Sequence, residues 1–266
     1  MGPSERQLGI VSYDIANGRG GKGIKLLLPQ KIQPGKRYPV LYILPVSAAF
    51  WDQWWHNGII EAAQQDIADQ YGVICVYPQF ERMPWYGDNP GNPKIRQESF
   101  ILNDVIPFID RNFPVSPGPE GRYLIGFSKS GFGAYHLLLR HPDIFGMAAA
   151  WDAPMIIDDL NVWGSGLRDV FGDKQNLRKY DIPALLSERA PELRSGRPRF
   201  VLMGYSYAKE QIEMIHALMA SLNIPHVYDN SEKRDHRWDS GWFKNAVQSL
   251  FDYEHRENAL TGLSFP

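Results

Sequence analysis

The sequence predicts an α/β fold with a mostly parallel central sheet and helices on both of its faces. Apolar stretches without polar interruption recur along the chain, and amphipathic helical patterns separate them. Strands that are buried on both faces of a sheet have this continuous apolar character. The length of 266 residues suits one compact domain of this class, which we expect to span residues 1–266.

The first two strands are expected to form a β-hairpin. Residues 8–15 and 24–28 are apolar or alternating, and a glycine-rich turn over residues 18–23 joins them. The glycine spacing of this turn matches nucleotide-binding loops, but the turn leads into a strand, so no phosphate would meet a helix N-terminus. Further strands are expected at residues 39–44, 71–77, around 123, 146–151, 199–203 and 226–228, and helices at 58–71, 98–113, 129–140, 208–222 and 242–253.

Residues 154–198 interrupt the alternation of strands and helices. Glycines and prolines are frequent in this segment, which has short helical stretches but no apolar repeat of its own. Long insertions in compact domains are typically functional loops. We therefore expect residues 154–198 to form an irregular cap or a wall of a cleft, and not a second domain.

Charge and composition exclude several classes of function. The 28 basic and 30 acidic side chains give a net charge of -2, which offers no attraction to nucleic acid or anionic lipid. No stretch approaches the ~18 apolar residues that would span a membrane. Cys75 is the only cysteine and lies in an apolar strand, so it is expected in the core and cannot form an internal disulfide. The compartment stays open between the cytoplasm and export with removal of a signal.

A serine at a sharp turn is the strongest functional signal. The run Arg122-Tyr-Leu-Ile-Gly-Phe-Ser-Lys-Ser-Gly131 predicts a strand, a tight turn with Ser128 at its apex, and a helix. This is the layout of a nucleophile elbow, in which the positions two before and two after the serine must be small. Gly126 and Ser130 meet this requirement, although glycine is usual at the second position. Ser128 is therefore the candidate nucleophile.

A histidine and an acid are needed beside such a serine, and they follow it along the chain in this type of site. His236 lies after the last predicted strand and before the last helix, where a general base is expected. No aspartate directly follows the strand at 199–203, where the acid usually lies. Asp152, directly after the strand at 146–151, is the first choice, and Glu210 is the alternative; Asp152 could also be a turn-capping residue.

Two backbone N–H groups are expected to form an oxyanion hole. One is that of Lys129, directly after the candidate nucleophile, and the other lies in the loop after Leu44. Pro45 has no N–H, so Val46 or Ser47 is the expected second donor.

Residues 39–44, 84–90, 98–100, 104–110, the elbow and 140–145 follow one another in an order that is typical of one group of proteins. On these segments the chain resembles the α/β-hydrolase superfamily, and in particular its esterase D-like "putative esterase" group, which includes feruloyl and acetylxylan esterases, S-formylglutathione hydrolases and mycolyltransferases. The resemblance covers about residues 35–150 and the loop of His236. It implies an α/β-hydrolase fold and ester hydrolysis through an acyl-enzyme, with no metal or cofactor. The chain departs from the group at Lys129 and Ser130, at Pro45-Val46 in place of His-Gly, and at the acid.

Aromatic residues near the expected cleft suggest the type of ligand. Trp51, Trp54 and Trp55 follow the oxyanion loop, and Trp85 and Tyr86 follow the strand at 71–77. Aromatic faces at a cleft would suit a sugar ring or an aromatic acyl group. These side chains could equally pack beneath the loops.

The sequence thus predicts a serine esterase that acts on an acylated carbohydrate or a similar polar ester. The alternatives are an acyltransferase to a sugar hydroxyl, which would use the same residues, and a non-catalytic binding protein that keeps the fold.

Overall fold

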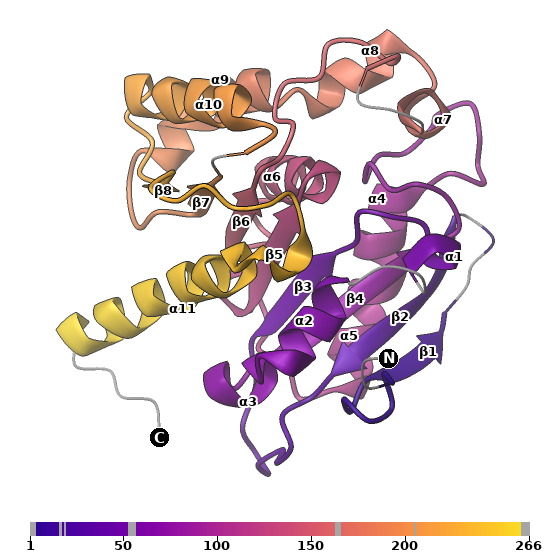
Figure 1. Ribbon diagram of the computed structural model, residues 1–266, viewed down its shortest axis with the longest axis vertical. Helices are drawn as coiled ribbons and strands as arrows, with labels where there is room; N and C mark the ends of the chain where they lie inside the picture. Colours follow the sequence, from indigo (N-terminus) through magenta and orange to yellow (C-terminus); the bar gives the residue numbers. More distant parts are fainter. Residues whose placement is uncertain are drawn as a thin grey trace.

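The computed structural model describes residues 4–15, 18, 20–52, 57–162, 166–204 and 206–261. Within them, eight strands form one sheet in the order β1-β2-β4-β3-β5-β6-β7-β8 (Figure 1). β1 and β2 form the predicted antiparallel hairpin, and β2 also pairs antiparallel with β4; all other pairs are parallel. The strands are β1 Val11–Asp14, β2 Gly21–Leu27, β3 Val40–Leu44, β4 Ile74–Phe80, β5 Arg122–Phe127, β6 Met147–Trp151, β7 Phe200–Met203 and β8 Val227–Asp229.

Helices cover both faces of the sheet, which confirms the predicted α/β fold. α2 (Gly58–Gln64), α3 (Ile67–Tyr71) and α11 (Trp242–Thr261) lie in front of the sheet in Figure 1 and pack on one face. α4 (Gln97–Phe100), α5 (Ile106–Asn112), α6 (Lys129–Arg140), α9 (Ile182–Leu193) and α10 (Lys209–Ser221) share the core of the other face. Alternate residues of β3 belong to the two cores, because successive side chains of a strand point to opposite faces.

The structure refines three of the predicted helices. The helix expected at 58–71 is divided, because Asp66 adopts a left-handed conformation with φ 55° between α2 and α3. The helix expected at 98–113 contains a π-helical turn, Ile101–Val105, between α4 and α5. The last helix continues beyond residue 253 to Thr261.

The segment between β6 and β7 holds short helices and one longer one. α7 (Leu167–Phe171), α8 (Lys174–Leu177) and the 3₁₀ turn Arg178–Tyr180 precede α9. Buried side chains from α7 and α9 join the core that α6 and α10 share, so part of this segment is built into the domain. The remaining short helices are α1 (Ala49–Asp52) and the 3₁₀ turns Pro119–Gly121 and Trp238–Ser240.

None of the helices in the described part of the chain combines the length and the apolar character needed to cross a membrane.

Candidate active site

Ser128 occupies a strained turn between β5 and α6. Its φ is 53°, in the left-handed region that a non-glycine residue rarely adopts. The turn leaves no space for a side chain at Gly126, where a Cβ atom would lie 2.1 Å from the carbonyl oxygen of Ser130. The turn therefore requires glycine at 126, as the sequence motif predicts.

Ser130 takes the place where glycine is usual, and its hydroxyl is used within the turn. The side chain is fully buried. Its Oγ donates a hydrogen bond to the carbonyl oxygen of Phe127 at 2.8 Å and accepts one from the N–H of Phe127 at 2.9 Å. Serine in place of glycine at position 130 thus adds two hydrogen bonds within the elbow.

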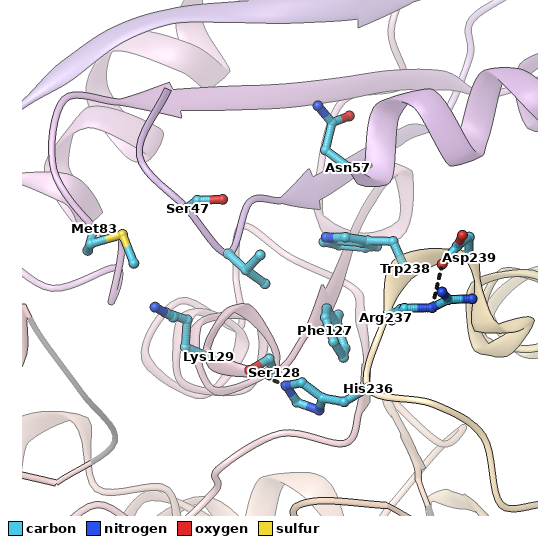
Figure 2. A pocket seen from close by; sticks show the side chains of 11 residues that line it. Ser47, Asn57, Met83, Phe127, Ser128, Lys129, His236, Arg237, Trp238 and Asp239 are labelled. Atoms are coloured by element: carbon cyan, nitrogen blue, oxygen red, sulfur yellow. Dashed lines mark hydrogen bonds and ion pairs between the residues drawn. The ribbon is translucent and has the colours of Figure 1, made fainter. Parts of the chain in front are cut away.

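His236 lies beside Ser128, as Figure 2 shows. Its Nε2 is 3.1 Å from Oγ of Ser128, within hydrogen-bond distance. The centroid of the imidazole is 4.4 Å from that of the Phe127 ring and 5.4 Å from that of the Tyr207 ring.

Asp152 lies on the other side of the imidazole. Its Oδ2 is 2.6 Å from Nδ1 of His236, and its Oδ1 accepts a hydrogen bond from the N–H of Ala208 at 2.8 Å. Burial works to raise the pKa of this carboxyl, but the hydrogen bonds from His236 and Ala208 outweigh it and hold the pKa below the ordinary value. Asp152 is therefore charged at neutral pH and fixes the proton of His236 on Nδ1, which leaves Nε2 to accept from Ser128.

The alternative acid, Glu210, lies elsewhere. Glu210 is exposed in the first turn of α10, whereas both ring nitrogens of His236 are engaged by Asp152 and Ser128. The structure brings Ser128, His236 and Asp152 together in one chain of hydrogen bonds that does not include Glu210.

A cavity of about 540 Å³ opens beside Ser128. Lys129, Val46 and Ser47, the expected sources of oxyanion N–H groups, all lie in its wall. Sequence reasoning missed several other residues of this wall, among them three that directly follow His236 and were recognisable from that position. The lining residues that were missed are Asn57, Met83, Phe127, Arg237, Trp238 and Asp239.

The expectation for the cleft aromatics needs correction. Trp85 and Tyr86 are both fully buried and do not line the cavity, because their loop folds inward against α6. The hydroxyl of Tyr86 donates a hydrogen bond to the carbonyl oxygen of Pro45, so it supports the loop that carries Val46 and Ser47. Trp51 is 52% exposed on α1 but is not part of the cavity wall. Trp54 and Trp55 lie outside the described residues.

Residues 21–199 match the model of the family described as "Putative esterase". Esterase Rv1288 of Mycobacterium tuberculosis is 27% identical over 136 residues, which cover 50% of this chain but only 29% of that relative.

Solved structures share the fold over almost the whole chain. A ferulic acid esterase superposes with a TM-score of 0.72 at 19% identity, covering 92% of this chain and 97% of that one. An S-formylglutathione hydrolase from Agrobacterium tumefaciens gives a TM-score of 0.72 at 14% identity, with 92% and 94% covered. At these identities the likeness concerns the fold.

Proposed function

The chain belongs to the "Putative esterase" family, and we propose that it is a serine esterase that hydrolyses a carboxylic ester through an acyl-enzyme. The observation that carries this proposal is the chain of hydrogen bonds from Asp152 through His236 to Ser128 at the edge of a cavity. A nucleophile, a base and an orienting acid in hydrogen-bond contact are the arrangement that serine hydrolysis requires.

Ser128 acts as the nucleophile. As its Oγ bonds to the carbonyl carbon of the ester, Nε2 of His236 takes the hydroxyl proton. The resulting imidazolium returns this proton to the oxygen of the leaving alcohol when the C–O bond breaks. In the second half a water molecule gives a proton to His236 and attacks the acyl carbon. When the bond from that carbon to Oγ breaks and the acid leaves, the imidazolium returns the proton to Oγ of Ser128. Asp152 keeps the imidazole in place and balances its charge throughout.

The oxyanion of the tetrahedral intermediate needs donors on the opposite side of Ser128 from His236. The N–H of Lys129 is a suitable donor because it belongs to the first turn of α6, where backbone N–H groups have no partner within the helix. The N–H of Val46 or Ser47 is the second donor, since both residues line the same cavity.

The substrate we propose is an acylated carbohydrate or a similar polar ester. The cavity wall combines apolar side chains with polar ones, which suits a ligand with hydroxyl groups. The ferulic acid esterase that shares the fold is consistent with this class. Trp85 and Tyr86 are buried and do not line the cavity, so Trp238 is the indole that a ligand could contact in the described wall.

Hydrolysis is preferred over acyl transfer to a sugar. A transferase must exclude water from its acyl-enzyme. A cap formed by residues 154–198 over the cavity would be the means of doing so. None of the described residues in that segment lines the cavity, and the His236 side chain is 36% exposed. Water therefore has access to the bond that it must cleave.

The test is turnover of 4-nitrophenyl acetate, methyl ferulate and acetylated xylo-oligosaccharides by the wild type and by Ser128→Ala. We expect turnover by the wild type and loss in Ser128→Ala, with free acid as the product even when a sugar acceptor is added. Sugar esters among the products would establish the transferase instead. Absence of turnover on every ester would favour a non-catalytic binding protein.

A further inference from the structure

Lys129 places a cation in the wall of the cavity beside Ser128. Its side chain extends from the first turn of α6 into the space that Ser47 and Met83 border, as Figure 2 shows. The ammonium lies 5.6 Å from the centroid of the buried Trp85 ring, within the range of a cation–π contact. The indole thus holds the ammonium in position at the edge of the cavity.

No carboxylate within the described chain pairs with this ammonium, and no protein atom there accepts a hydrogen bond from it. The other cation of the cavity wall is different: Nε of Arg237 lies 3.1 Å from Oδ1 of Asp239. Asp152 is fully buried behind His236 and is engaged by that ring. Among the described lining residues, Lys129 is therefore the charge that is left unbalanced.

A partly buried, unpaired ammonium is costly for the folded protein. Burial lowers the pKa of Lys129, because desolvation disfavours its charged form and no anion compensates. A cation–π contact does not require this burial: Lys36 lies 5.1 Å from the ring of Tyr38 and is exposed. The position of Lys129 thus provides three unused N–H donors at the reacting centre.

We propose that Lys129 selects esters that carry an anionic group, a carboxylate, sulfate or phosphate, on the acyl or the alcohol part near the scissile bond. The inference rests on the proposed esterase function and narrows its substrate class to acidic esters. A bound anion would supply the missing counter-charge and accept the free N–H groups, and hydrogen bonds to charged groups are the stronger ones.

The experiment compares pairs of esters that differ in one negative charge. 4-Nitrophenyl hydrogen adipate against 4-nitrophenyl methyl adipate places the charge on the acyl part. 4-Acetoxybenzoate against 4-acetoxybenzamide places it on the alcohol part. The readout is kcat/KM of the anionic ester divided by that of its neutral partner, measured for the wild type, Lys129→Met and Lys129→Arg.

We expect Lys129→Met to lower this ratio by roughly 10- to 100-fold for at least one pair. Lys129→Arg should retain most of the ratio, because it keeps the charge. The matched control is Lys36→Met. Lys36 also makes a cation–π contact, but it lies before the start of β3, whereas the cavity lies beyond the end of that strand, so the ratio should be unchanged. Raising the salt concentration should lower the wild-type ratio.

Equal ratios in the wild type and Lys129→Met for both pairs would overturn the inference. Because the neutral esters report on esterase activity by themselves, this outcome is distinct from failure of the proposed function. If no ester of either pair is turned over, the proposed function fails and the inference fails with it.

Discussion

The carboxylate of Asp152 lies 2.6 Å from Nδ1 of His236, although 84 positions of the chain separate the two residues. Asp152 follows β6, whereas the acid of such a site usually follows the strand that is β7 here. β6 and β7 are neighbours in the sheet, so a side chain at the end of either strand can reach the same histidine. The residue that follows β7 is Gly204, where a Cβ atom would lie 2.6 Å from the backbone nitrogen of Asp152. The backbone of Asp152 at the end of β6 thus comes so close to the end of β7 that only glycine fits at position 204.

We predict that Asp152→Asn lowers kcat by roughly 10²–10⁴-fold. The asparagine amide would present N–H to Nδ1 of His236 or force the other tautomer, and either change removes the base that Ser128 needs. Glu210→Gln, which changes the exposed carboxylate in the first turn of α10, is the matched control and should retain activity within about 3-fold of the wild type. A larger loss in Glu210→Gln than in Asp152→Asn would refute the assignment.

We predict that Gly204→Ala lowers activity by displacing Asp152. The added methyl group would collide with the backbone of Asp152, and φ at this position is 132°. Gly196→Ala is a matched control, because Gly196 also has a positive φ of 98° but has open space around it. Both variants lose stability from backbone strain, measurable by urea unfolding. Only Gly204→Ala should also show a fall in kcat at a temperature where both variants are folded; similar kcat values would contradict this account.

Acid should destabilise the protein through His136. This side chain is fully buried, and burial lowers its pKa from 6.5 to about 3 despite the opposing charge of Glu98. Between these two pH values the unfolded chain carries a proton that the folded protein does not. The free energy of unfolding therefore falls as the pH is lowered from about 6.5 towards 3, by up to about 1.4 kcal/mol per pH unit from this group.

The measurement is urea unfolding between pH 7 and pH 4.5, with His136→Gln for comparison. His136→Gln is expected to be less stable at pH 7 but to have a shallower dependence on pH. Parallel curves for the two proteins would show that His136 does not contribute to the loss in acid.

The structural features that were predicted best from the sequence are those that depend only on residues close together in the chain. The elbow, with Gly126, Ser128 and Ser130, needs only one strand, one turn and one helix, all within a short stretch. The bounds expected for the helix after Ser128 agree with α6 (Lys129–Arg140) for the same reason. Asp152 could be selected because a carboxylate at the end of an apolar strand has few roles other than contact with a polar partner.

The features that were predicted least well from the sequence are those that depend on the path of a loop. For Trp85 and Tyr86 the sequence left open whether they face a ligand or pack beneath the loops, because composition does not distinguish a ring that rims a cleft from one that packs below it. The cavity wall assembles residues such as Asn57, Met83 and Trp238 from separate loops. Their approach is set by the three-dimensional fold, and no local pattern in the sequence indicates it.

The central claim is that Ser128 is the nucleophile. The most direct test is labelling with a fluorophosphonate probe, followed by peptide mass spectrometry of the wild type, Ser128→Ala and His236→Gln. The account predicts stoichiometric modification of Ser128 in the wild type, none in Ser128→Ala, and slower labelling in His236→Gln, which lacks the base. Ester hydrolysis that persists in Ser128→Ala, or labelling at a different residue, would contradict it.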